Sequence, residues 1–280
     1  PLSAIYGNAA GGVIQLFTPD GKGRPSVAGR FSAGSDSSWK ADLSSQGEVG
    51  GVSYVVDTSR FVSDGYRDHS AVRRDQSLVK LGVSPSQDGR LTFVASSFNQ
   101  VADDPLGLDW ATARSKPTSV VPAALAYDTR KRISQQQGGL NYEHRFGEDR
   151  LQLSAYAGQR SVIQYQSIPT FVQANPRHSG GIIDFERSFA GASARWIARR
   201  QVAGGGLTTT FGADYERSVD DRQGFENFVG ATLGVKGALR RDETDRVAAS
   251  GVYVQSQWQG ERWNFSGGLR HSRVAFNVSD

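Results

Sequence analysis

Arginine and aromatic residues occur together in several segments of this chain that are also rich in turn-forming residues. A guanidinium group donates paired hydrogen bonds to a carboxylate, and an aromatic face stacks on a planar ring. These residue types can therefore take part in ligand binding. The candidate binding residues are Tyr66, Arg67, His69, Arg130, Tyr165, Gln166 and Arg240.

Each of these candidates also has a structural explanation. Arg67 precedes Asp68, and an exposed ion pair between the two would contribute only about 0–1 kcal/mol. Arg240 and Arg241 precede Asp242, so they could form a solvated charge cluster or bind phosphate groups. Residue type alone therefore does not separate ligand binding from loop structure.

The sequence shows no pattern typical of an enzyme or of a metal site. It contains no cysteine, no G-x-S-x-G elbow and no H-E-x-x-H pair, and its four histidines are far apart. Gly11-Gly12 lacks the spacing of a nucleotide-binding loop. Asp103-Asp104 could hold calcium, although such a pair also forms solvated turns. We expect a protein that is not an enzyme, with no cofactor and no protein-bound metal.

Charge and hydropathy narrow the class further. The formal net charge is +4, but Arg and Lys are interspersed with Asp and Glu, and no basic run with aromatic residues stands out. We therefore expect no nucleic-acid partner. No stretch of about 18 apolar residues is present, so no transmembrane helix is predicted. Barrel strands escape that test because only alternate residues face lipid.

The elements that carry the candidate residues are predicted to be β-strands. In 151–165 the odd positions carry Leu, Ala, Ile and Tyr, and the even positions are mostly polar. A period of two places these sets on opposite faces of a strand. Side chains predicted to face the interior are Arg160, Asp214, Asn264 and Arg270. The predicted strands are 25–33, 38–47, 52–63, 73–85, 90–101, 132–146, 150–165, 184–199, 207–217, 247–259 and 262–276.

Short and long connections alternate between these strands, and only the short first loop at 34–37 breaks the rule. An antiparallel membrane barrel has this sidedness, with tight turns in one compartment and long loops in the other. A soluble all-β protein is the alternative, but it has no reason to keep this sidedness through so many hairpins. The long connections are Asp64–Val72, Ala102–Lys131, Gln166–Ile183 and Ser218–Arg246.

The loop between the third and fourth predicted strands is favoured as a binding site. At about nine residues between long strands, it would stay close to the interior of the barrel. Its residues Tyr66, Arg67 and His69 are therefore our preferred ligand-binding set.

The run Tyr6-Gly7-Asn8-Ala9-Ala10-Gly11-Gly12-Val13-Ile14 leads into a short strand-like stretch that ends at Thr18. This segment resembles the last stretch of the plug domain of TonB-dependent outer-membrane receptors. The resemblance implies that 1–22 end a plug domain and that 23–280 form the N-terminal half of a transmembrane β-barrel of about 22 strands. The chain would then be an all-β piece of a longer receptor. The residues of the plug motif are Tyr6, Gly7, Asn8, Gly11 and Gly12, followed by Val13-Ile14.

Sequence words in the long connections resemble one branch of that family. This branch contains the receptor for pyrroloquinoline quinone and is often described as iron-siderophore receptors. The resemblance implies uptake of the quinone, and uptake of a ferric siderophore is the alternative because siderophores are also often anionic. The words are Gly65-Tyr66-Arg67-Asp68-His69, Asp103-Asp104-Pro105, Gln164-Tyr165-Gln166-Ser167-Ile168-Pro169 and Leu239-Arg240-Arg241-Asp242.

The family resemblance also implies a mechanism and a location. Loops and plug apex would capture the ligand, and TonB, acting through the region before this chain, would drive the plug to rearrange. The barrel would lie in the bacterial outer membrane, in contact with lipid and lipopolysaccharide. A passive porin or adhesion barrel would have no plug, so the segment 6–18 argues against it.

Overall fold

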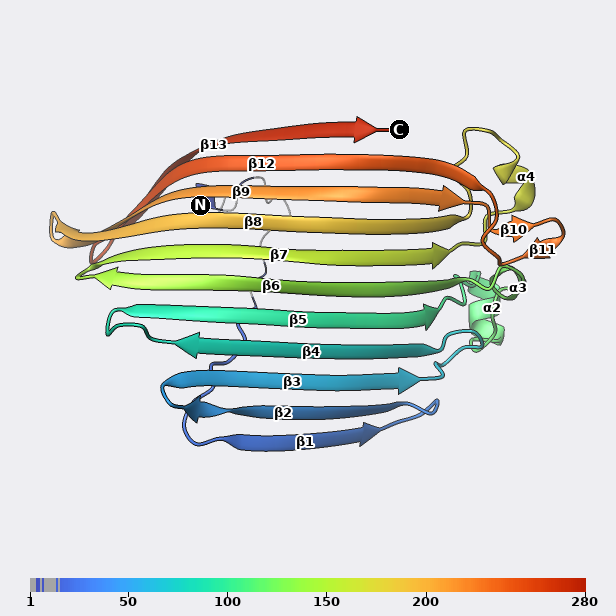
Figure 1. Cartoon of the computed structure of the whole chain (residues 1–280), viewed down its shortest axis with the longest axis horizontal. Coiled ribbons are helices and arrows are strands. Elements are labelled where there is room, and N and C mark those ends of the chain that lie inside the picture. The colour runs from blue at the N-terminus through green and yellow to red at the C-terminus, as the bar shows by residue number, and fades with distance from the viewer. Residues whose placement is uncertain (1–3, 6, 8–13, 15) are drawn as a thin grey trace.

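A computed structural model describes residues 4–5, 7, 14 and 16–280, and within them eleven strands form one antiparallel sheet in chain order. Each strand pairs with the next, except that β9 pairs with β12 because a small β10–β11 hairpin lies between them (Figure 1). The all-β prediction is confirmed. The strands are β1 (Ser26–Ala33), β2 (Trp39–Val49), β3 (Val52–Ser63), β4 (Val72–Val83), β5 (Gly89–Asp103), β6 (Arg130–Phe146), β7 (Asp149–Tyr165), β8 (Ile182–Val202), β9 (Gly205–Phe225), β10 (Phe228–Val229), β11 (Thr232–Leu233), β12 (Leu239–Gln259) and β13 (Asn264–Ser279).

The predicted sidedness of the connections is also confirmed. The helices α2 (Trp110–Ser115), α3 (Pro122–Ala126) and α4 (Thr170–Gln173) and the β10–β11 hairpin all lie at one end of the sheet (Figure 1). The opposite end carries tight turns. Among the described residues, no helix is long and apolar enough to cross a membrane.

One predicted loop is wrong. The segment Ser218–Arg246 was expected to be a single long connection, but β9 continues to Phe225 and β12 starts at Leu239. The physical reason is that both faces of these strand ends are polar, so the alternation that reveals a strand disappears. Backbone pairing such as Asp221 with Thr244 holds them in the sheet nevertheless.

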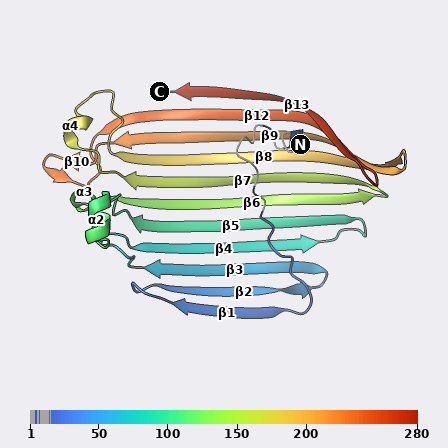
Figure 2. The ribbon, with the colours of Figure 1, turned by 180° about the vertical axis from the view of Figure 1, so that it is seen from behind.

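The sheet has two distinct faces. Residues 16–25 run across one of them towards β1 (Figure 2). On that face Lys80 Nζ donates to the carbonyl of Thr18 (2.8 Å), and Arg270 Nη1 donates to that of Ala4 (3.4 Å). We call it the lumen face and the opposite one the outer face. The predicted interior residues Arg160, Asp214, Asn264 and Arg270 all lie on the lumen face, as the strand registers require.

The outer face is apolar only on the half of the strands near the tight turns. In β9 the outer-face residues Phe211, Ala213 and Tyr215 are followed towards the loops by Arg217 and Asp221. About 9–11 tilted residues cross a bilayer, whereas β9 has 21 residues. The loop-side halves of the longest strands therefore extend beyond the apolar band.

Aromatic side chains gather on the outer face at the turn end. Phe146 stacks on Trp196 with ring centroids 5.4 Å apart, and Trp258 lies 5.9 Å from Phe265. Such a cluster is typical of a membrane interface. Tyr253 lies on the lumen face instead, where a Cβ on Gly212 would come 2.2 Å from its ring.

Candidate ligand-binding site

Hydrogen bonds and ion pairs link the loops nearest the centre of the sheet into two groups. The first loop block comprises 64–71 and 104–129, and the second comprises 166–181 and 226–238. In the first block the half-buried Arg67 donates from Nε to Ser119 O (2.9 Å), from Nη1 to Leu106 O (2.6 Å) and from Nη2 to Pro105 O (3.1 Å). One guanidinium thus joins two loops that are distant in sequence.

The two neighbouring candidates, His69 and Tyr66, differ in their surroundings: His69 contacts another loop, whereas Tyr66 is exposed. His69 Nε2 lies 2.8 Å from the carbonyl oxygen of Thr129, whose side chain is fully buried. Tyr66 is 61% exposed and keeps its ring accessible to a ligand. Arg67 and His69 therefore position the first loop block, and direct ligand contact by either one stays a prediction.

Arg130 and Tyr165 form a stacked pair at the ends of β6 and β7. The guanidinium carbon lies 3.6 Å from the ring centroid, and Arg130 also pairs with Asp128. The register places Arg130 opposite Tyr165, on the same face as Arg132 and thus on the outer face. Their predicted contact with a ligand in the lumen has no support from this placement.

The second loop block contains a buried pair of carboxamides. Gln173 and Asn227 are both fully buried, and Gln173 Nε2 donates to Asn227 Oδ1 at 2.6 Å. Asn227 Nδ2 donates to the carbonyls of Gln166 (2.6 Å) and Ile168 (3.2 Å). The backbone carbonyl of the predicted site residue Gln166 thus helps to join the loop 166–181 to the loop 226–238.

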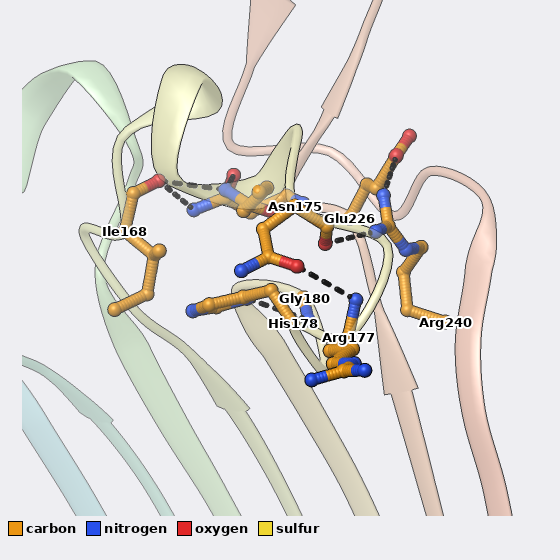
Figure 3. Close-up of polar contacts among 9 residues, drawn as sticks. Ile168, Asn175, Arg177, His178, Gly180, Glu226 and Arg240 are labelled. Carbon is orange, nitrogen blue, oxygen red and sulfur yellow. Dashed lines mark hydrogen bonds and ion pairs between the residues drawn. The ribbon is translucent and has the colours of Figure 1, made fainter.

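Arg240 adds a charged link to the second block. Its Nη1 pairs with Glu226 at 2.8 Å, and its Nη2 donates to the carbonyl of Asn175 at 2.7 Å (Figure 3). The side chain is only 16% exposed. Arg241 points to the lumen face, where its Nε lies 3.3 Å from Glu243.

Below the loops, the lumen face carries more cations than acids. Prediction from the sequence missed most of these residues, because a charged residue at one strand position gives no sign of which face it occupies. Arg187 binds Asp220 through two hydrogen bonds. From β4 to β12 the lumen-face cations near the loop ends are Arg74, Lys131, Arg160, Arg187, Arg222 and Arg241, and the acids are Asp220, Glu243 and Asp245.

The segment before β1 is attached to the same face by ion pairs. Asp20 pairs with Lys80 (2.7 Å) and Arg90 (3.2 Å), and the hydrogen bond from Lys80 lowers the pKa of this carboxyl below its usual value. A Cβ on Gly7 would come 3.2 Å from Arg270 Nε, so the segment lies close to that side chain. The plug-motif residues Tyr6, Asn8, Gly11 and Gly12 lie outside the described residues.

Solved structures with a similar fold cover nearly the whole chain. They include the unliganded ferric citrate transporter FecA (16% identity, 91% of this chain and 38% of that one, TM-score 0.72). BauA, the ferric preacinetobactin receptor of Acinetobacter baumannii, has 12% identity (94% and 43% covered, TM-score 0.77). Fiu, a ferric-catecholate import receptor of E. coli K12, has 11% (93% and 46%, TM-score 0.73). The chain spans less than half of each of these proteins.

The family assignment follows from the sequence match together with this fold. The family model described as TonB dependent receptor-like, beta-barrel matches residues 77–280. The matched range includes β5 to β13 and all of the second loop block. The chain therefore belongs to the TonB-dependent receptors, and its sheet is part of their outer-membrane β-barrel.

Proposed function

We propose that the receptor containing this chain takes up an anionic ferric chelate of the siderophore class. The observation that carries this proposal is the excess of cations on the lumen face next to the loop blocks. A surface lined by one sign of charge raises the local concentration of oppositely charged ligands. Chelates that bind iron through carboxylate or catecholate oxygens commonly carry negative charge.

The names of the similar folds support this ligand class. They refer to ferric citrate, ferric preacinetobactin and ferric catecholates. At 11–16% identity the likeness establishes the fold alone, so the charge of the lumen face remains the main argument. Pyrroloquinoline quinone is the second candidate, favoured by the loop words around Tyr66 and Tyr165. Its carboxylates would use the same cations.

We further propose that transport is energised by TonB through the part of the receptor that precedes this chain. The supporting feature is the way the segment before β1 is held. Its contacts with Lys80, Arg90 and Arg270 are polar, so water can replace them when the segment moves. The apolar outer band would contact outer-membrane lipid and lipopolysaccharide.

Growth of a receptor-deleted strain tests the ligand class. We expect poor growth on ferric siderophore under iron limitation and normal growth on limiting external quinone. The opposite pattern would replace the ferric ligand with pyrroloquinoline quinone. Normal growth in both conditions would exclude both ligands.

Calorimetry on the full-length receptor tests the role of the lumen charge. The double variant Arg222→Gln/Arg241→Gln should weaken binding of ferric citrate or a ferric catecholate at least about tenfold. Arg246→Gln is the matched control, because Arg246 lies on the outer face of the same strand and should leave the affinity unchanged. Equal affinity for both variants would refute the electrostatic argument.

A further inference from the structure

A pocket on the lumen face lies between the loop blocks and the contact with the N-terminal segment. Its walls include Gln135, Tyr156, Arg160, Arg187, Phe189 and Glu216, from four neighbouring strands. We call it the wall pocket. None of these residues belongs to the loops, so the pocket is separate from the loop blocks described above.

The position of the pocket follows from the strand register. Glu216 is two residues along β9 from Asp214, and Asp214 pairs with Arg270 at 2.7 Å. Arg270 in turn donates to the carbonyl of Ala4. Successive residues on one face of a strand are about 7 Å apart. A ligand that moved from the loops towards the N-terminal segment would therefore pass the wall pocket.

One cation of the pocket has no acidic partner among the described residues. Arg160 and Arg187 lie directly opposite each other on β7 and β8, and cross-strand like charges destabilise a sheet. Asp220 neutralises Arg187 with two hydrogen bonds, at 2.7 and 2.5 Å. Arg160 has only the amide oxygen of Gln135, at 3.3 Å. Its remaining N–H groups are suited to an anionic ligand.

The other wall of the pocket is aromatic. The rings of Phe189 and Tyr156 are 6.3 Å apart and inclined at 50°. Phe189 lies across Gly158, where a Cβ would come 2.5 Å from the ring, and Tyr156 reaches over Gly191 to donate to Glu216 at 3.2 Å. The two glycines allow both rings to lie along the sheet and present their faces to the lumen.

We propose that the wall pocket binds an aromatic ring that carries an anionic oxygen, either carboxylate or phenolate. The ring stacks on Phe189 and Tyr156, and Arg160 binds the anionic oxygen. This inference rests on the proposed entry of an anionic ligand into the lumen, and it identifies the part of the ligand that the barrel wall recognises.

Binding of small probes to the full-length receptor in detergent micelles tests the pocket independently of transport. The probes are 2,3-dihydroxybenzoate, which is an aromatic anion, cyclohexanecarboxylate, which lacks the ring, and benzyl alcohol, which lacks the charge. Ligand-observed NMR titration should show binding of 2,3-dihydroxybenzoate and at least about tenfold weaker binding of the other two. Equal binding of all three would overturn the proposed ligand class.

Substitutions then assign the binding to the pocket. Arg160→Gln should weaken 2,3-dihydroxybenzoate at least about tenfold, and Phe189→Leu about threefold to tenfold. Lys131→Gln is the matched control, because it removes a lumen-face cation outside the pocket and should change the affinity less than about twofold. Unchanged affinity in Arg160→Gln would overturn the site.

Two further measurements keep the outcomes distinct. Arg160→Lys retains the charge without the planar guanidinium and should restore part of the affinity, which separates lost binding from a misfolded barrel.

Siderophore uptake by cells tests the proposed function separately. If the receptor takes up the siderophore but Arg160→Gln binds the probe normally, only the wall pocket is refuted. If uptake fails while probe binding depends on Arg160, the transport proposal is refuted and the site stands.

Discussion

The two loop blocks perform the same task, holding long loops over the end of the barrel, but they are fastened differently. In the first block most of the side-chain links come from one half-buried guanidinium, that of Arg67, which donates to three backbone carbonyls, and His69 adds one contact with the carbonyl of Thr129. In the second block the link is shared by the buried Gln173–Asn227 pair and by Arg240. Loss of Arg67 should therefore remove most of the side-chain hydrogen bonds that hold the first block. In the second block each single substitution removes only part of them.

The largest effect is expected from Arg67→Ala. Three carbonyls lose a charged donor, which costs about 2–4 kcal/mol of local stability. We expect faster amide exchange in 104–129 and at least about tenfold weaker ligand binding, equivalent to about 1.4 kcal/mol. Hydrogen exchange and calorimetry on the full-length receptor measure the two effects.

Two further variants, Arg67→Lys and Tyr66→Phe, separate an effect on loop structure from an effect on ligand contact. Lysine keeps the charge but cannot donate in three fixed directions, so loop exchange should stay fast. Tyr66→Phe should change affinity without changing exchange if Tyr66 contacts the ligand. Native exchange rates in Arg67→Ala would show that the first block is not held by this side chain.

Asn227→Ala should produce the next largest effect. It leaves the carbonyl of Gln166 without its donor, at a cost of about 1–3 kcal/mol, while Gln173 Nε2 keeps its hydrogen bond to the carbonyl of Ile168. Exchange in 166–181 should accelerate, but ligand affinity should fall less than in Arg67→Ala because Arg240 still joins the two loops. Combining it with Gln173→Ala should add little, since the two residues share their hydrogen bonds. Strict additivity would contradict the paired arrangement.

A smaller effect is expected from Arg240→Gln. The glutamine amide can still donate one of the hydrogen bonds that Arg240 makes to Glu226 and to the carbonyl of Asn175, so the substitution should cost only about 1 kcal/mol. A double-mutant cycle with Glu226→Gln, read by exchange in 226–238, measures the coupling. A loss as large as that of Asn227→Ala would show that the second block also depends on one charged residue.

The smallest effect concerns Asp109, which caps α2 within the first block. The side-chain hydrogen bond from Thr112, followed by backbone N–H groups, lowers the pKa of this exposed carboxyl from its usual 3.8. Because the pKa is lower in the folded state, the cap stabilises the folded state fully above about pH 3.8. This stabilisation is lost as the pH falls through the pKa of the folded state. Fluorescence of Trp110, isolated by comparison with Trp110→Phe, should therefore change only below that pH. A transition near neutral pH would exclude the cap as its cause.

Prediction from the sequence succeeded where the two faces of a strand meet different environments. The first seven predicted strands agree with the structure to within two residues at each end. Prediction failed at 218–225 and 239–246, where both faces of the strands are polar. Arg67 and Arg240 were predicted to bind a ligand, and that role stays a prediction. Their partners in the fold, which are backbone carbonyls and the carboxylate of Glu226, could not be predicted because they lie in other parts of the chain.

The sequence by itself determined the strands, their antiparallel order and the sidedness of the loops, because alternation and turn chemistry are local properties of the chain. Tertiary structure alone decided how each charged side chain is used. Arg67 holds a loop, Arg130 lies on the outer face, and Arg160 remains without an acidic partner on the lumen face. The physical reason is that a guanidinium can satisfy carbonyls, acids or a ligand equally well. Only the three-dimensional arrangement determines which of these lies within hydrogen-bonding distance.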